Sequence, residues 1–241
     1  MMSTSKNTSS NSRPLNGDER WLAYDAYVFD IDGTLLNGRD RVHYSSFQGA
    51  LREVYGCHRD ISEVPLHGNT DIGILRATTR LGGIEDCVFE AHLQEALAWM
   101  RASTAENISG FRAEACPSIP AMLAILHERG KLLGVATGNL EEVGWPKLAA
   151  AGLKHYFHFG CFSDHHEQRA DIFRNAATEA RHRLGPDATV CFIGDTPNDI
   201  DAARRNHCPV IAVATGIHPY ETLQALSPDF CLRTCDELFT A

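Results

Sequence analysis

The feature that most constrains the fold is a series of short apolar runs, several of which end in polar residues. Six runs have the length and composition of β-strands, the last being the weakest: 26–30, 132–137, 158–162, 189–195, 210–215 and 229–232. The clearest runs are continuously apolar, which is typical of parallel strands buried on both faces. From residue 119 onward, apolar stripes at helical spacing lie between the runs. This alternation predicts an α/β fold with a doubly wound, Rossmann-like parallel sheet.

The first run does not share this alternation, because a long segment without a convincing strand follows it. The segment carries helical stripes instead, and Asn69 or Thr70 is placed to cap a helix. It is too long for a crossover loop, so it predicts a small helical domain inserted over 38–110. The α/β core domain is then expected over 21–37 and 111–241, with hinges near 36–39 and 109–111.

The net charge argues against two classes of partner, and the cysteine pattern argues against two kinds of structural framework. The 241 residues carry a formal net charge of −9, so no overall basic field attracts nucleic acid or an anionic membrane. The eight cysteines are scattered without a C-x-x-C pair, which favours a reduced, cytoplasmic chain over a disulfide or zinc framework. Monomer and homodimer both stay open.

The first twenty residues are polar and rich in serine and asparagine. They contain no apolar segment of the kind found in secretory signals. We therefore interpret residues 1–20 as a disordered tail. No apolar run approaches the length of a membrane span.

Polar clusters stand at three of the predicted strand ends. They read D-I-D-G-T (30–34), A-T-G-N (136–139) and I-G-D-T-P-N-D (193–199). In open α/β sheets ligands bind at the carboxyl ends of strands, so these clusters are expected to meet. Asp30 and Asp32 are two residues apart and point the same way along an extended strand. Two like charges this close repel each other, which lowers stability unless a cation or a reaction needs both of them.

The chemistry of the three clusters suits a metal and a phosphate. If the strand ends converge, Asp30, Asp32 and Asp195 form an all-oxygen site of the kind that Mg²⁺ prefers. Thr137, with the backbone N–H groups and the helix start that follow it, suits a phosphate. A carboxylate that attacks a phosphate dianion needs a cation to neutralise the repulsion.

These motifs, in this order, resemble the haloacid dehalogenase superfamily over residues 24 to about 215. The helical insertion resembles the type-one cap of the phosphoglycolate phosphatase and β-phosphoglucomutase branch. The resemblance implies that Asp30 is a nucleophile that forms an aspartyl-phosphate. Asp32 would protonate the leaving oxygen and later deprotonate the hydrolytic water. The residues expected to hold the phosphoryl group and substrate are Thr137, Gly33, Thr34, Gly138 and Asn139.

The resemblance also implies a metal site and a basic residue. Mg²⁺ would be held by Asp30, the backbone carbonyl of Asp32 and Asp195, with Asp199 orienting that shell. The family usually has a lysine before the helix that follows the third strand, and the segment 163–173 has none. We assign this role to Arg169, which keeps the charge and can bridge carboxylate and phosphate.

Plainer interpretations exist for several of these residues. Asp199 could be only an acid in the first turn of a helix, and Arg169 only a surface residue. His165 and His166 are given no ligand role. Four residues of the insertion could face a substrate or serve equally well as caps and surface: His67, Asn69, Thr70 and Arg76.

The sequence therefore predicts a Mg²⁺-dependent phosphatase acting on a small phosphorylated metabolite, with phosphoglycolate-like monoesters the leading substrates. A sugar-phosphate mutase of the β-phosphoglucomutase kind is the enzymatic alternative. A non-enzymatic phospho-aspartate receiver is the alternative from a different class, but it needs neither Asp32 nor a long helical insertion. Asp32 also argues against a dehalogenase, because a halide leaves without a proton.

Overall fold

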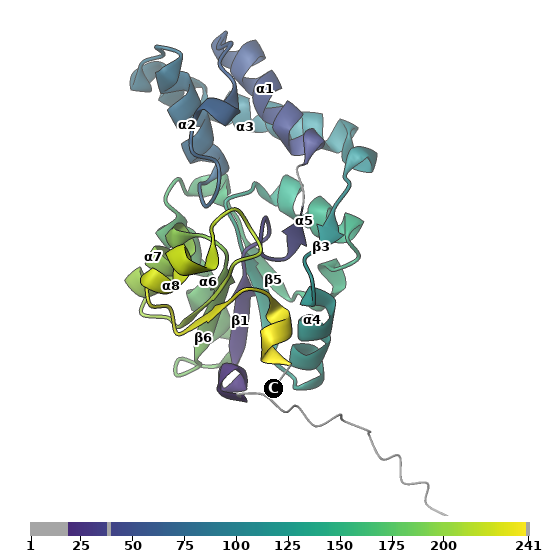
Figure 1. The fold of residues 1–241 in the computed structure, drawn as a ribbon. Helices are drawn as coiled ribbons and strands as arrows, with labels where there is room; N and C mark the ends of the chain where they lie inside the picture. The colour runs from purple at the N-terminus through teal and green to yellow at the C-terminus, as the bar shows by residue number, and fades with distance from the viewer. Residues whose placement is uncertain (1–18, 38–39, 240–241) are drawn as a thin grey trace, which may run out of the picture.

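The computed structural model describes residues 19–37 and 40–239, which form an α/β core with a group of helices above one edge of its sheet (Figure 1). The predicted disordered tail lies outside the described residues up to residue 18. Its last two residues belong instead to a 3₁₀ turn, η1 (Glu19–Leu22). In this turn Trp21 is only 1% exposed, and the prediction of disorder is wrong for residues 19 and 20. A large aromatic ring buried this fully anchors the turn to the core.

The core contains a six-stranded sheet in which every neighbouring pair is parallel. Its strands are β1 (Ala26–Phe29), β4 (Leu132–Ala136), β5 (Phe159–Cys161), β6 (Val190–Gly194), β7 (Val210–Val213) and β8 (Phe230–Leu232). Their order is β5-β4-β1-β6-β7-β8. All six predicted strands and the predicted fold class are confirmed. Because β1 lies between β4 and β6, the three polar strand ends are neighbours.

Helices cover both faces of the sheet, which explains why the strands are apolar at every position. Tyr27 and Phe29 of β1 face one apolar cluster, shared with α4 (Ile119–Glu128) and α5 (Glu141–Ala150). Ala26 and Val28 face the opposite cluster. The helices on that side are α6 (Arg169–Leu184), α7 (Pro197–Arg205) and α8 (Tyr220–Ala225). The sheet is therefore wound on both sides, as predicted.

Three helices form the group above the sheet, which we call the cap (residues 40–110): α1 (Arg41–Tyr55), α2 (Asp71–Leu81) and α3 (Asp86–Glu106). They share an apolar cluster of their own, with Leu51, Leu75 and Leu97 fully buried. Thr70 caps α2, because its hydroxyl accepts the backbone N–H of Gly73. The helical character predicted for the insertion is confirmed.

Two strands of two residues each were not predicted from the sequence. β2 (Leu36–Asn37) and β3 (Glu114–Ala115) pair antiparallel where the chain leaves the core and where it returns. Such short strands have no detectable periodicity. The remaining elements are 3₁₀ turns: η2 (Ile61–Glu63), η3 (Ile108–Gly110), η4 (Lys154–Tyr156), η5 (Ser163–His165) and η6 (Cys235–Leu238). Within the described ranges, none of the helices combines the length and apolar character that crossing a membrane requires.

The cap lies against the carboxyl edge of the sheet and is joined to it by hydrogen bonds to backbone carbonyls. The N–H of Asp71 donates to the carbonyl of Gly138 over 2.7 Å. The Thr70 hydroxyl donates to the carbonyl of Glu167 over 2.8 Å. Asn198, on the core side, donates to the carbonyl of Gly68 over 2.9 Å. The cap therefore covers the edge where the polar strand ends meet.

Candidate active site

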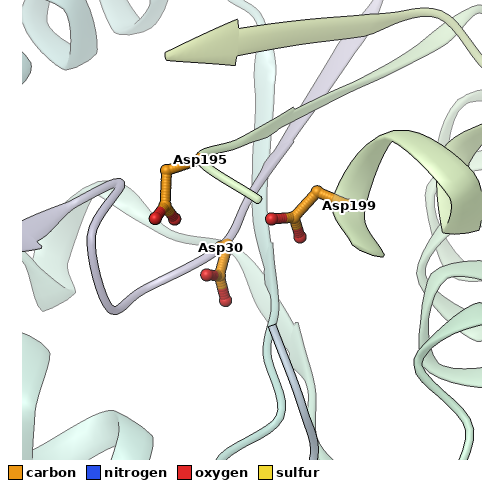
Figure 2. A group of neighbouring side chains, drawn as sticks. All are labelled: Asp30, Asp195 and Asp199. Carbon is orange, nitrogen blue, oxygen red and sulfur yellow. The ribbon is translucent and has the colours of Figure 1, made fainter. Parts of the chain in front are cut away.

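Three carboxylates from separate elements meet at this edge. Asp30 follows β1, Asp195 follows β6, and Asp199 lies in the first turn of α7. One oxygen of each lies within 4.8 Å of those of the other two, and the side chains converge on a common space (Figure 2). All three are buried, at 5%, 1% and 0% exposure respectively. Three acids this close are stable together only if charge is neutralised among them.

Asp195 has one oxygen that is held and one that is not. The Thr34 hydroxyl donates to Oδ1 of Asp195 over 2.9 Å. The Oδ2 atom is buried and has no hydrogen-bond partner among the described residues. Two glycines line it closely, since an added Cβ would lie 2.4 Å from it at Gly33 and 1.8 Å at Gly216. A buried oxygen without a partner, in a cradle kept open by glycines, fits a metal ligand.

The pKa values of the clustered acids also favour a metal site. Burial raises the pKa of Asp30 to about 7, with the Arg169 charge opposing and the charges of Asp199 and Asp32 adding to the effect. Burial also raises the pKa of Asp195 well above its ordinary range, reinforced by the charges of Asp199 and Asp30. A hard divalent cation would stabilise the ionised forms of these acids, so the donor set fits Mg²⁺.

Arg169 begins α6 and joins two of these acids. Its Nη2 lies 2.8 Å from Oδ1 of Asp30, and its Nε donates to Oδ1 of Asp199 over 2.8 Å. It is only 9% exposed, so the interpretation of Arg169 as a surface residue is wrong. Asp199 also caps the start of α7, because its Oδ2 accepts hydrogen bonds from the N–H and the hydroxyl of Thr196. The same carboxylate thus stabilises α7 and fixes the arginine.

Thr137 follows β4 on the other side of β1 and is 1% exposed. Its hydroxyl oxygen accepts the side-chain amide of Asn139 over 2.7 Å. Within the described part of the chain, no acceptor is found for the hydroxyl proton itself. The Thr137 hydroxyl can therefore donate to a phosphate oxygen.

With this geometry in place, comparisons with known proteins are informative. The model of the family described as haloacid dehalogenase-like hydrolase matches residues 24–207. The chain belongs to this family. It is therefore a hydrolase, and the resemblance carried by its three motifs is confirmed.

Relatives of this hydrolase are named as phosphatases. The probable phosphatase IndB of Dickeya dadantii (strain 3937) is 28% identical over 220 residues, which cover 89% of this chain and 91% of that protein. A phosphoglycolate phosphatase of Yersinia pestis is 24% identical, covering 92% and 94% of the two chains. A predicted phosphatase from Clostridium acetobutylicum has a similar structure, with a TM-score of 0.67, 22% identity and coverage of 90% and 96%. At this identity the structural likeness shows the fold.

In this hydrolase two residues predicted to bind substrate support the acidic cluster instead. The backbone N–H of Gly33 donates to the carbonyl of Leu36 over 2.8 Å, so it is not directed at a phosphate. The Thr34 hydroxyl is fully buried and donates to Asp195. Gly33, with φ of +90°, makes the tight turn after β1 that places Thr34 there.

The other glycine and the asparagine of the predicted substrate set contact the cap and Asp32. An added Cβ at Gly138 would lie 2.1 Å from the backbone oxygen of Asn69, so the cap lies directly on this residue. The side-chain amide of Asn139 donates to Asp32 over 2.8 Å as well as to Thr137. Its carbonyl oxygen accepts from Lys147 over 2.9 Å. The side chain of Asn139 therefore positions other site residues.

Asp32 stands apart from the acidic cluster, which corrects the expectation that its side chain shares a side with that of Asp30. Strand β1 ends at Phe29, so the alternation of side chains does not extend to Asp32. Its carboxylate contacts Lys147 instead, with Nζ at 3.0 Å from Oδ1 and 2.9 Å from Oδ2. The predicted metal contact through the backbone carbonyl of Asp32 stays a prediction.

The surroundings of Asp32 favour its ionised form. Burial by itself would raise the pKa of Asp32, but the charges of Lys147 and His43 oppose this. Hydrogen bonds from Lys147 and Asn139 add to that opposition, and the net effect is a lowered pKa. The two aspartates of the first motif thus have different electrostatic surroundings, which raise the pKa of Asp30 and lower that of Asp32.

The sequence analysis missed Lys147 and its neighbours His43 and Asp71. A signal for Lys147 exists, because it falls on the apolar stripe of α5 with Val143 and Leu148 and is 2% exposed. A lysine on a buried stripe is rare unless it is paired. No comparable signal marks His43 or Asp71, which reach the site only through the packing of the cap.

Three of the cap residues considered for substrate binding have structural contacts. Thr70 is the cap of α2, and Arg76 pairs with Glu167 of the core over 2.7 Å and with Glu90 over 2.5 Å. Asn69 accepts the backbone N–H of Thr70 over 2.8 Å. These contacts favour the interpretation of this segment as helix caps and cap–core interface.

Proposed function

We propose that this hydrolase is a Mg²⁺-dependent phosphatase of small phosphorylated metabolites, acting through an aspartyl-phosphate on Asp30. The observation that carries the proposal is the position of the Asp30 carboxylate, beside Asp195, Asp199 and Arg169. Asp32 lies nearby with a separate set of partners. A nucleophile among neutralising groups and a second acid outside them match the needs of phosphoryl transfer.

In the first step, a carboxylate oxygen of Asp30 attacks the phosphorus of the ester. A bond forms between this oxygen and phosphorus while the bond from phosphorus to the leaving oxygen breaks. Asp32 donates a proton to the leaving oxygen, so the product departs as an alcohol. We assign stabilisation of the phosphoryl oxygens to Arg169, which lies 2.8 Å from Asp30, and to the buried Thr137 hydroxyl, which follows the neighbouring strand β4.

In the second step, Asp32 takes a proton from the water that attacks the aspartyl-phosphate. The bond between phosphorus and Asp30 breaks, inorganic phosphate leaves and the Asp30 carboxylate is restored. Asp32 can accept this proton because it is left ionised when it protonates the leaving oxygen in the first step.

The metal would be held by Asp30 and Asp195, with Asp199 beside them. The buried, unpartnered Oδ2 of Asp195 supports this assignment. Bound Mg²⁺ supplies positive charge that offsets the repulsion between the Asp30 carboxylate and the phosphate dianion. Arg169 supplies the other positive charge at the same place.

Phosphoglycolate-like monoesters remain the leading substrates. The support is that a relative aligned over nearly the whole chain is named a phosphoglycolate phosphatase. All eight cysteines are free, which fits the reduced, cytoplasmic location that we propose for this enzyme.

The test is phosphate release from a panel of esters with Mg²⁺ and then with excess chelator. The panel holds phosphoglycolate, sugar phosphates, nucleotides and an aryl phosphate. We expect chelator-sensitive release that is highest for one small ester and is abolished in Asp30→Asn. The control is Asp187→Asn, at an exposed acid before β6, at the opposite end of that strand from Asp195. Isomerised sugar phosphate without phosphate release would instead identify a mutase.

A further inference from the structure

We propose that Lys147 is a positioning residue that holds the Asp32 carboxylate toward the leaving group, and that His43 of the cap completes its site. This inference rests on the proposed function, in which Asp32 protonates the leaving oxygen. It adds a core lysine and a cap histidine to the acid–base part of the site.

The contacts of Lys147 account for all of its hydrogen-bonding capacity. Its Nζ lies 3.0 and 2.9 Å from the two oxygens of Asp32. It also lies 2.9 Å from Oδ1 of Asn139 and 3.1 Å from Nδ1 of His43. An ammonium has three N–H donors, and these acceptors occupy them all. Lys147 therefore has no donor left for a substrate and acts through Asp32.

The burial of Lys147 argues against the interpretation that its ion pair with Asp32 only stabilises the fold. The side chain of Lys147 is 3% exposed, whereas that of Asp32 is 45% exposed. Burying an ammonium is costly, and apolar residues of similar size often stabilise such positions as well or better. The half-exposed carboxylate gains most from the contact, because Lys147 and Asn139 together fix both of its oxygens. The arrangement orients Asp32 at the expense of burying a charge.

The cap contributes through His43, which lies on α1. The Lys147 ammonium can only donate, so Nδ1 of His43 accepts. Nε2 then carries the proton and donates to Oδ2 of Asp71 over 3.0 Å. The same Asp71 oxygen accepts the backbone N–H of Leu140 over 2.9 Å, at the start of the helix that carries Lys147. The chain of contacts thus begins and ends on α5 and passes through the cap.

This geometry links the position of the cap to the orientation of the acid. When the cap lies on the core, His43 fills the remaining side of the Lys147 ammonium. Lys147 is then held against Asp32 from two directions, by Asn139 and by His43. Displacement of a catalytic group by about 1 Å costs on the order of 100-fold in rate, so such support is expected to have a large effect.

The test compares two substrates in Lys147→Met, whose side chain is of similar length and can pack on the apolar stripe. One substrate is the best alkyl phosphate of the panel, and the other is 4-nitrophenyl phosphate. The parameter is kcat/KM, which reports the steps up to departure of the leaving group and excludes hydrolysis of the aspartyl-phosphate. Nitrophenolate leaves without a proton, so its departure does not depend on the orientation of Asp32.

We expect Lys147→Met to lose about 100-fold in kcat/KM with the alkyl ester and less than about 10-fold with the aryl ester. Lys147→Gln, which keeps an N–H donor for Asp32, should recover part of the loss with the alkyl ester. His43→Leu should show the same preference for the aryl ester with a smaller loss. Lys154→Met is the matched control, because Lys154 is exposed and packs over Trp145 away from Asp32.

Equal losses with both substrates in folded Lys147→Met and Lys147→Gln would overturn the inference, as would unchanged kcat/KM with the alkyl ester. Circular dichroism and the thermal midpoint establish folding of each variant. Failure of the proposed function gives a different result. In that case the wild-type protein releases no Mg²⁺-dependent phosphate from either substrate.

Discussion

The guanidinium of Arg169 lies 2.8 Å from the carboxylate of Asp30 and contacts Asp199 with the same Nη2 atom at 2.5 Å. A single buried cation thus bridges the predicted nucleophile and an acid in the first turn of α7. The family resemblance implies a lysine at this place, and the planar arginine meets both acids at once.

Removal of Arg169 should impair catalysis strongly. We expect Arg169→Ala to lower kcat/KM by about 100- to 1,000-fold, because two buried acids beside the phosphoryl site lose their counter-charge. Arg169→Lys should recover part of the activity, since it restores the charge without the fork. Steady-state phosphate release measures both variants. Arg174→Ala is the control on the same helix, because Arg174 is largely exposed. Near-normal activity in Arg169→Ala would contradict the assigned role.

The contact between Thr34 and Asp195 should tune metal affinity. Thr34→Val removes the 2.9 Å hydrogen bond to Oδ1 of Asp195 while keeping the shape of the side chain. We expect the Mg²⁺ concentration for half-maximal activity to rise about 10-fold or more, because partners of metal-binding carboxylates hold them in place. The measurement is a Mg²⁺ titration of activity. Thr178→Val, at an exposed position of α6, is the matched control. A Mg²⁺ titration curve of Thr34→Val identical to that of this control would contradict the prediction.

Stability without metal should fall as the pH rises. The pKa of Asp30 is raised to about 7 in the folded protein, above its ordinary value of 3.8. Between these values the folded state binds more protons than the unfolded state, so the free energy of unfolding decreases with rising pH. Asp195 contributes in the same direction, since its pKa is also raised.

Mg²⁺ competes with protons for these carboxylates, so its stabilising effect should grow with pH. With saturating MgCl₂ we expect the thermal midpoint to rise by about 5 °C at pH 8 and by much less at pH 5. Thermal unfolding with MgCl₂ or with chelator at each pH measures this. Asp195→Asn should lose the increase at pH 8, whereas exposed Asp201→Asn should keep it. An increase that is equal at both pH values would argue against the acidic cluster as the metal site.

The close approach of Gly138 and the cap predicts a variant with impaired activity and an intact core. In Gly138→Ala the added Cβ would lie 2.1 Å from the backbone oxygen of Asn69. This contact cannot be relieved by a side-chain rotation, so the cap must move. We expect kcat/KM to fall about 10- to 100-fold because misplacement by about 1 Å is costly in catalysis. Phosphate release measures the loss of activity, and the thermal midpoint shows whether the core stays intact. Unchanged kcat/KM would show that the cap need not lie this close.

Much of the fold and part of the site could be predicted from local sequence. The six strands were recognisable because each is a short apolar run, and their parallel arrangement followed from the lack of alternation. Asp30, Asp195 and Asp199 were identifiable because the end of a strand or the first turn of a helix fixes each of them to its own element. These relations depend on neighbours in the chain, which a single sequence contains.

Other features depended on partners far apart in the chain. The orientation of Asp32 is decided by Lys147, which lies 115 positions away. The expected alternation with Asp30 failed because the strand ends before Asp32 and a turn begins. Gly33 and Thr34 were predicted to meet a phosphate, but the turn that they form packs against Asp195, and the Thr34 hydroxyl donates to that acid instead.

The sequence by itself determined which groups are available at the candidate site, since its acids and Thr137 stand at the carboxyl ends of neighbouring strands. Only the tertiary structure decided how those groups are used. It buries Arg169 between two acids, sets Lys147 against Asp32 and brings His43 from the cap to meet them. The physical reason is that these contacts depend on how helices pack on the sheet. That packing is a sum over many weak apolar contacts, and no local pattern records it.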